Sequence, residues 1–486
     1  MRKLSRILSS VLLGSMLLGT AACGGGGNEN AETTAANAEV TEATAETTAA
    51  RPELKLPKKD YNGYEFVIYI RPATNIVNYP ADQYSEELTG DVLSDAIYKR
   101  NLAVSEQFNI KFVADENETS GGTGAATVIQ AGDDAYDMIV CHARATFAYA
   151  TKGLTLEWNK QLPYVDLDAE WWNQNARENF TICNKLYSMT GGISYNGYAS
   201  TKVTYFNKNL CKDLGMEYPY QAVLNDTWTF DKFGEMVKSA YKDLDGDTKV
   251  DIMKDQFGFG SNWWGTPINI LYTAGESLCT ADEKGMHLSI NKEGVINALE
   301  KLTALSKFDG CYLQLKDGYD DITKAFMEGR MLFMETQLAS TDTLRAMDDD
   351  FGIIPCAKID DTIDGYYTGV DAGGNGICIP VTASDAERTS VILEALCYNG
   401  YYDVIPVYYD VVLTSKYARD AESVEMLDII FAGRIYDIGY YMAHNFNSFG
   451  HDLFSKNVEF ASYYASGESA ANTKLAEINE FYLKND

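Results

Sequence analysis

AFMEGRMLFMET, at Ala325–Thr336, places a helical segment directly before a strand-like segment. The helical run stops at Gly329, because glycine suits the left-handed conformation that closes many helices. An alternating run begins at Arg330, and its side chains should point to opposite faces in turn, with Phe333 and Glu335 on the same face. We interpret the stretch as a crossing between two lobes, with Glu335 emerging where the lobes meet.

The length and composition fit a folded body with two lobes. The chain has 486 residues, which is too long for one small core, and 46% of them are hydrophobic. The formal net charge is −30 at pH 7. Nucleic acid is therefore excluded as a partner, since phosphate binding needs a basic face. We interpret the acidity as a solvated surface that keeps the protein soluble.

The beginning of the chain has the pattern of an export signal followed by a spacer. Residues 1–22 combine a basic start with the apolar run Ile7–Leu18, which is too short to span a bilayer. The segment resembles a bacterial lipoprotein signal, although Thr20 stands where that pattern prefers leucine. The resemblance implies cleavage before Cys23 and lipidation of its thiol. Residues 23–59 have few large apolar side chains and are predicted to form a disordered spacer.

From Tyr61 onward, strand-like and helical segments alternate. Strands are predicted at Tyr64–Ile70, Ile110–Val113, Tyr136–Cys141, Phe257–Phe259, Phe351–Ile354 and Gly376–Ile379. Helices are predicted over 91–108, from 208 to 215, after Trp228, over 295–305 and after a capping box at Ser384–Glu387. This alternation indicates βαβ units and an α/β fold with largely parallel sheets.

Four segments in a fixed order carry a resemblance to a known family. They are Tyr205–Gly215 (YFNKNLCKDLG), AFMEGRMLFMET, Asp350–Lys358 (DFGIIPCAK) and Gly374–Thr382 (GNGICIPVT). Together they resemble the extracellular solute-binding proteins of ABC transporters, family 1-like, with the type II periplasmic-binding-protein fold. The resemblance implies two lobes, each a mainly parallel sheet flanked by helices, joined by crossing hinge strands.

The same resemblance sets expectations for the lobes and their motion. It assigns residues 61–195 and 335–372 to the N-terminal lobe, and residues 200–330 and 376–486 to the C-terminal lobe. Gly329–Glu335 would be one of three crossings and would act as a hinge. A ligand between the lobes would be enclosed when a few linker residues change conformation.

Two arginines are the first candidates for ligand contacts. Arg71 and Arg144 each follow a buried strand of the first lobe. Open α/β sheets bind ligands at the carboxyl ends of their strands. The guanidinium groups could fork onto hydroxyls or a carboxylate, or could pair with surface acids.

Aromatic and polar candidates follow from the predicted crossings. Trp263 and Trp264 lie in a loop after a strand, where such receptors often stack a sugar on an aromatic ring; one of them could instead belong to the core. The remaining candidates for the ligand site lie beside the later crossings and are Glu335, Tyr367, Asp371 and Asn375.

One acidic loop has the spacing of a calcium site. Asp243, Asp245, Asp247 and Asp251 occupy the first, third, fifth and ninth positions of such a loop. Thr248 replaces the glycine expected sixth, Lys254 stands in place of the closing acid, and Asp255 is one place late. Two interpretations stay open, a structural calcium ion and an acidic turn. No other cofactor is predicted.

The cysteines and histidines do not suggest an enzyme. Eight cysteines after Cys23 are scattered through apolar contexts, so we expect buried free thiols in place of a disulfide framework. The sequence contains no GxSxG, HExxH or P-loop motif. The four histidines are dispersed, and His142 alone is expected near the cleft.

We therefore predict a monomeric, lipid-anchored receptor that binds a sugar or oligosaccharide and passes it to the membrane subunits of an ABC importer. It would work at the extracellular face of the cell membrane, or on the periplasmic side if an outer membrane is present. A surface glycoside hydrolase or a polysaccharide-binding adhesin is the alternative class. An oligopeptide or amine ligand is an alternative within the receptor class.

Overall fold

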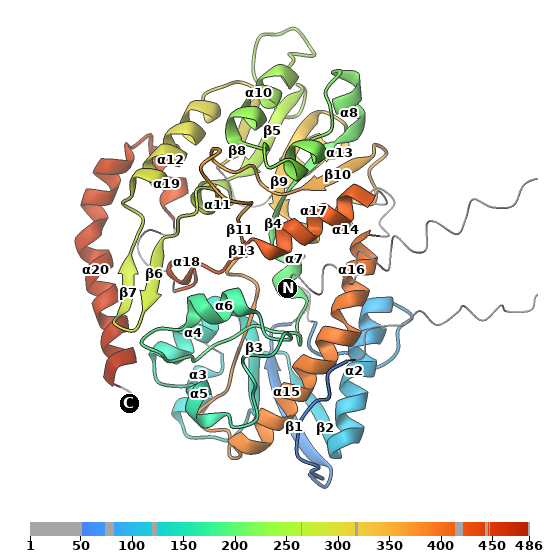
Figure 1. Cartoon of the computed structure of the whole chain (residues 1–486), viewed down its shortest axis with the longest axis vertical. Coiled ribbons are helices and arrows are strands. Elements are labelled where there is room, and N and C mark those ends of the chain that lie inside the picture. Colours follow the sequence, from blue (N-terminus) through green and yellow to red (C-terminus); the bar gives the residue numbers. More distant parts are fainter. Residues whose placement is uncertain are drawn as a thin grey trace, which may run out of the picture. The chain divides into compact units, whose positions relative to one another are not determined.

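A computed structural model describes residues 51–72, 82–118, 124–263, 265–315, 319–413, 421–442, 446 and 448–484. Lys55–Asp486 forms one compact unit. Two larger sheets and two short two-stranded pairings are found among its described residues, with helices between the strands (Figure 1). None of the described helices is both long and apolar enough to cross a bilayer.

The first sheet is built from the early strands and one late strand. Its order is β12-β3-β1-β2, with β1 (Tyr64–Ile70), β2 (Ile110–Asp115), β3 (Met138–His142) and β12 (Asn375–Cys378). The β1 strand is parallel to both β2 and β3, whereas β12 runs antiparallel to β3. The aromatic and β-branched run of β1 fits a strand covered on both faces, because Phe66, Ile68 and Ile70 are buried on one face and Tyr69 is buried on the other.

The second sheet contains the strand-like half of Ala325–Thr336. Its order is β10-β4-β9-β5-β8, with β4 (Lys202–Asn207), β5 (Phe257–Asn262), β8 (Cys311–Gln314), β9 (Met331–Gln337) and β10 (Phe351–Ile354). The strands β5, β8 and β9 are parallel, whereas β4 is antiparallel to both of its neighbours. The sheets are therefore mixed, and the second is less parallel than predicted.

Helices connect these strands. The longer ones are α2 (Val92–Phe108), α4 (Ala143–Thr151), α10 (Phe230–Ala240), α11 (Thr266–Thr273), α12 (Glu293–Ser306), α13 (Asp320–Met327), α15 (Ala386–Asp403), α16 (Ile405–Leu413), α17 (Ala421–Ala432), α19 (Phe449–Lys456) and α20 (Phe460–Lys484). The short ones are α3 (Ala126–Gln130), α5 (Trp158–Gln161), α6 (Gln174–Phe180), α7 (Asn196–Ala199), α8 (Lys208–Asp213), α9 (Tyr220–Leu224), η1 (Leu338–Ser340), α14 (Thr341–Leu344) and α18 (Ile438–Tyr441). Two strand pairs lie outside the sheets, β6 (Cys279–Asp282) with β7 (Gly285–Leu288), and β11 (Thr368–Gly369) with β13 (Arg434–Ile435). Figure 1 shows α20, in red, running beside the β6–β7 hairpin, which it contacts through β7.

The helix boundaries follow the capping chemistry. Asp91 caps α2 by accepting hydrogen bonds from the backbone N–H groups of Leu93 and Ser94, and Asn109 ends the helix in the left-handed conformation. The predicted capping box at Ser384 is wrong by one position. Asp385 is the N-cap of α15 and accepts from the backbone N–H of Arg388 at 2.9 Å.

The predicted crossing at Gly329–Glu335 is wrong, although its local structure is right. Gly329 has φ +71° and separates α13 from β9, as expected. The strand β9 nevertheless lies inside the second sheet, between β4 and β5, and α13 packs against it. A helix, a glycine and a strand look the same along the chain whether the strand stays in one sheet or passes to another.

The segments that connect the two sheets lie elsewhere. Thr201 forms an isolated antiparallel bridge with Val370, and the backbone N–H of Asp371 donates to the carbonyl of Ser200 at 3.0 Å. One of these two segments leads into β4, and the other leads from β11 to β12. We call the two connecting segments, residues 194–201 and 370–374, the paired connection.

The predicted lobe boundaries also differ from the sheets. The prediction places β10, within residues 335–372, in the N-terminal lobe, but this strand pairs with β4 of the second sheet. The strand β12 lies at the predicted start of the last C-terminal segment, but it pairs with β3 of the first sheet. A strand pairs with whichever sheet edge satisfies its backbone hydrogen bonds. The sequence of a short apolar strand does not show which sheet that is.

The eight later cysteines are free thiols, as predicted. Seven of them are buried, and Cys183 is half-buried. Cys23 lies outside the described residues.

Candidate functional site

Polar side chains gather where the parallel strands of both sheets end. In the first sheet, Arg71 follows β1, and His142 ends β3. In the second sheet, Asn262 ends β5, and Lys202 opens the antiparallel strand β4 at the same edge, opposite Gln337 at the end of β9. Carboxyl ends of parallel strands are where open α/β sheets bind ligands. We call these ends, with the paired connection between them, the candidate site.

Arg144 is held on the first sheet by its backbone and by an aromatic ring. Its backbone N–H donates to Nδ1 of His142 at 3.3 Å, so this imidazole acts as the N-cap of α4. Burial, together with the charges of Arg71 and Arg144, lowers the pKa of His142 to about 3. The ring is therefore neutral and can keep Nδ1 as an acceptor. The Arg144 guanidinium carbon lies 4.7 Å from the centre of the Tyr440 ring.

Lys202 supplies a buried cation from the second sheet. Its ammonium donates to the Tyr319 hydroxyl at 2.9 Å and lies 5.4 Å from the centre of that ring. Burial opposes the charge, but Tyr319 and Asp371 outweigh it and raise the pKa of Lys202. A Cβ at Gly265 would lie 3.0 Å from this ammonium and 3.1 Å from the Tyr319 hydroxyl, so glycine leaves room for the pair.

Asp371 interacts electrostatically with His142 of the first sheet and with Lys202 of the second. It stands in the paired connection, and its Oδ1 accepts the backbone N–H of Gly373 at 2.8 Å. Its charge acts on Lys202, His142 and Tyr440. The positive charges of Arg144 and Lys202 both act on the Tyr440 hydroxyl, although these two residues belong to different sheets. The candidate site therefore combines side chains of both sheets.

A cluster of buried polar side chains holds the paired connection in place. Asp82 accepts hydrogen bonds from the Ser194 hydroxyl at 2.7 Å, from the Asn196 backbone N–H at 2.8 Å and from the Asn375 amide at 3.1 Å. Arg71 donates to the Gly373 carbonyl at 2.8 Å. Asp82 thus joins residues 194 and 196 of one connecting segment to Asn375, which directly follows the other segment, and so helps to fix the part of the chain that carries Asp371.

The sequence of the central part of the chain identifies its family. Residues 103–400 match the family described as bacterial extracellular solute-binding protein. The chain belongs to this family. Its members capture small molecules outside the cytoplasm, so the function of this solute-binding protein is ligand binding at the extracellular or periplasmic face.

Solved structures of low sequence identity share the fold. UspC of Mycobacterium tuberculosis is 16% identical with a TM-score of 0.55, over 84% of this chain and 100% of that one. A maltose/maltodextrin-binding domain from Bdellovibrio bacteriovorus, bound to maltotriose, is 14% identical with a TM-score of 0.52, over 86% and 99%. An ABC substrate-binding protein of Listeria monocytogenes, in complex with cycloalternan, is 15% identical with a TM-score of 0.50, over 86% and 98%. No curated protein matches the chain.

The predicted site residues of this solute-binding protein separate into three groups. Arg71, Arg144 and Asp371 come together at the candidate site. Asn375 lies beside them in register with His142, but its amide donates to Asp82 and its carbonyl accepts from Arg71, so its role is to position the connection. Glu335, Trp263 and Tyr367 form the third group, and Trp264 lies outside the described residues.

Glu335 lies inside the second sheet's own core. Its Oε1 accepts the Thr266 hydroxyl at 2.8 Å, and it lines a cavity of about 20 Å³ together with Phe233, Asn269 and Cys356. Such a cavity has room for about one water molecule. Burial raises the pKa of Glu335. The structure thus places this carboxyl among core residues of the second sheet, where the charge of Lys202 also acts on it, and a ligand contact by Glu335 stays a prediction.

The structure describes two of the three aromatic candidates, Trp263 and Tyr367. Trp263 is only 8% exposed, and its ring lies 4.4 Å from that of His451 in α19, which covers it. Trp264 lies outside the described residues. Tyr367 is half-buried and directly precedes β11. A stacking role for Trp263 and Trp264 and a ligand contact by Tyr367 stay predictions.

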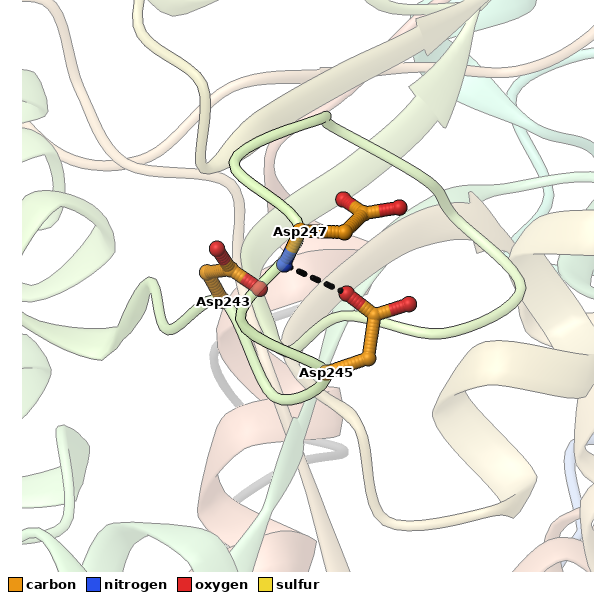
Figure 2. Close-up of side chains that lie close together, drawn as sticks. All are labelled: Asp243, Asp245 and Asp247. Carbon is orange, nitrogen blue, oxygen red and sulfur yellow. Dashed lines mark hydrogen bonds between the residues drawn. The ribbon is translucent and has the colours of Figure 1, made fainter.

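The acidic loop brings three of its four aspartates together. Figure 2 shows Asp243, Asp245 and Asp247 side by side, and one carboxylate oxygen of each lies within 4.8 Å of the others. The Lys254 ammonium lies 3.3 Å from Asp245 and 3.7 Å from Asp251. A cation of the chain itself thus stands where the closing acid of a calcium loop would be. Calcium binding by this loop stays a prediction.

Asp255, which lies one residue after the twelfth position of the loop, accepts hydrogen bonds from the backbone. Its two oxygens accept the N–H groups of Leu244 at 3.2 Å and Asp251 at 2.9 Å, which closes the loop at its base. Thr248, at the position where a glycine is expected, has φ +64°. The loop therefore adopts the left-handed turn that glycine would favour, without the glycine.

Sequence reasoning missed three residues of the candidate site, namely Lys202, Tyr319 and Tyr440. Lys202 opens a strand in which every residue is buried, and a lysine at that place was a usable signal, since buried lysines are rare without a role. Tyr319 and Tyr440 are two of 33 tyrosines and have no distinguishing neighbours in the sequence.

Proposed function

We propose that this solute-binding protein is the receptor of an ABC importer and captures a sugar or oligosaccharide between its two sheets. The observation that carries the proposal is the meeting of Arg144, Lys202, Asp371 and two tyrosine rings at the ends of both sheets. Carbohydrates need convergent donors and acceptors for their hydroxyls and flat apolar faces for their rings. The maltotriose and cycloalternan ligands of the structures named above support the same class.

The protein would act as a binding protein without an enzymatic step, as a monomer held at the membrane by a lipid on Cys23. A hydrolase is not needed to account for the site. An amine ligand fits poorly, because Arg71, Arg144 and Lys202 would repel a cation.

A thermal-shift screen with neutral and acidic sugars tests the proposal. A ligand at a hundred times its dissociation constant adds about 2.7 kcal/mol to the free energy of unfolding. Tyr319→Phe removes the hydroxyl that bonds Lys202, and we expect about fivefold weaker binding of the ligand found. Tyr464→Phe removes a tyrosine hydroxyl that donates to Glu468 within α20 and should leave binding unchanged. Absence of any sugar that shifts the transition would contradict the proposed function.

A further inference from the structure

The hairpin β6–β7 and the helix α20 form a second link between the two sheets, separate from the paired connection (Figure 1). The hairpin lies between α11 and α12 in the chain, and α12 packs against β8 of the second sheet. Helix α20 follows α19, which packs against α11. In the second half of α20, the Asn479 amide exchanges two hydrogen bonds with the backbone of Met286 in β7, at 2.7 and 3.0 Å. Hairpin and helix are therefore joined, and we call β6, β7 and α20 together the clasp.

The hairpin contacts a segment that belongs with the first sheet. That segment is residues 182–189, and Met189 forms an isolated antiparallel bridge with Ile377 of β12. The backbone N–H of Cys183 donates to the carbonyl of Asp282, the last residue of β6, at 2.9 Å. The clasp is thus continuous in the chain with elements of the second sheet and hydrogen-bonded to a segment of the first.

The last turn of α20 contacts the same segment. The Lys185 ammonium donates to the backbone carbonyl of Tyr482 at 2.5 Å, which satisfies a carbonyl that the end of a helix leaves without an intrahelical partner. A cation at this end also interacts favourably with the helix dipole. The centres of the Phe481 and Tyr482 rings lie 5.3 and 5.4 Å from that of Tyr187. Helix ends usually fray, whereas Tyr482 is fully buried, so this end of α20 is docked.

The clasp lies beside the candidate site. Tyr440, whose ring contacts Arg144, belongs to α18, and α18 packs against both β6 of the clasp and α4. Movement of the two sheets about the paired connection would pull residues 182–189 away from the clasp, unless the contacts between them hold. We infer that these contacts keep the two sheets together, and that the candidate site opens when the end of α20 and the hairpin release residues 182–189. The inference concerns how the site opens and goes beyond the proposed ligand.

Two measurements on the purified protein follow the clasp without any ligand. Hydrogen exchange at the Cys183 amide reports release, because this N–H is bonded to Asp282. The distance between spin labels on unnatural amino acids at Gln130 in α3 and Lys238 in α10, two exposed positions, reports separation of the sheets. For the native protein we expect a protected Cys183 amide and a single population of distances.

Lys185→Met keeps a long unbranched side chain and removes the donor to the Tyr482 carbonyl. We expect exchange at the Cys183 amide to become roughly 10- to 100-fold faster, as for a lost charge-assisted hydrogen bond, and a second population to appear at longer label distance. Tyr482→Ala removes the docked ring and should have the same two effects. Lys474→Met, which changes an exposed lysine of α20 paired with Glu477, is the matched control and should alter neither measurement.

The two measurements together decide the inference. Faster exchange at Cys183 with an unchanged label distance would overturn it, because the clasp would then be released without any separation of the sheets. Native exchange in both Lys185→Met and Tyr482→Ala would also overturn it, because these contacts would then not hold the clasp. Neither result involves a ligand, so failure of the inference leaves the sugar-receptor function standing.

Discussion

Glu394 accepts hydrogen bonds from two neighbouring indole groups in the core of the protein. Trp171 donates to its Oε1 at 2.8 Å, and Trp172 donates to its Oε2 at 3.0 Å. Burial raises the pKa of Glu394 to about 7, and the two indole donors act in the opposite direction. A carboxyl that is hard to ionise in the folded state makes stability depend on pH.

The sign of this dependence follows from the raised pKa. The folded protein binds the proton of Glu394 more tightly than the unfolded chain, so the contribution is complete below about pH 4.5 and is lost as the pH rises through 7. It amounts to roughly 3 kcal/mol of unfolding free energy across that window. Glu394→Gln should flatten this part of the profile, measured by urea unfolding at several pH values. Glu387→Gln, an exposed change on the same helix, should keep the slope. An unchanged slope in Glu394→Gln would show that the carboxyl stays ionised.

At the scale of single elements, the aspartates of the acidic loop accept hydrogen bonds from the backbone of the loop itself and lie near one lysine. Asp243 accepts the backbone N–H groups of Gly246 at 2.7 Å and Thr248 at 2.9 Å, and Asp245 accepts that of Asp247 at 3.1 Å. These bonds shape the loop, and the nearby Lys254 ammonium supplies a positive charge. Any divalent ion would therefore have to compete with that ammonium.

We expect Lys254→Glu to bind calcium at least about tenfold more tightly than the native chain, because it removes the competing cation and restores the closing acid. Calorimetry with calcium measures the difference. Lys249→Glu makes the same change of charge in the loop, away from the closing position, and should have a smaller effect. Equal affinities of the two variants would mean that charge alone, and not the ligand position, sets calcium binding.

The paired connection depends on one carboxylate. Asp82 is fully buried and accepts from Ser194, Asn196 and Asn375. Asp82→Ala would remove the acceptor that these three buried donors share, so we expect a loss of about 3 kcal/mol in unfolding free energy. Asp82→Asn keeps the shape and one acceptor oxygen and should lose less. Chemical denaturation measures both, and equal stabilities of Asp82→Ala and the native protein would rule out this role.

At the scale of the whole molecule, the proposed receptor has to remain at the cell surface while it captures its ligand. Cys23→Ala should release the protein from cell membranes into the medium, because lipid could no longer be attached to that thiol. Fractionation followed by immunoblotting measures the released fraction. A cysteine changed in the folded body, such as Cys183→Ala, is the control and should stay with the membrane. Retention of Cys23→Ala would contradict the lipid anchor.

Much of the local structure could be predicted from short stretches of sequence. The β1 strand at Tyr64–Ile70 has the predicted limits, since a run of aromatic and β-branched residues has few other stable conformations. Gly329 ends a helix before a strand, as its position indicated. The arginines after β1 and β3 reach the candidate site because the ends of parallel strands meet at one edge of a sheet.

Local sequence patterns are therefore sufficient to predict the α/β fold class, the order of most strands and helices, and the family. The tertiary structure alone decided which sheet each strand joins, so β9 became an inner strand of the second sheet and β12 an edge strand of the first. It also decided that Glu335 is a core carboxyl, and that Lys202, Tyr319 and Tyr440 meet beside Arg144 and Asp371. The physical reason is that strands and turns follow from neighbouring residues, whereas pairing and burial depend on hydrogen bonds and packing between residues far apart in the chain.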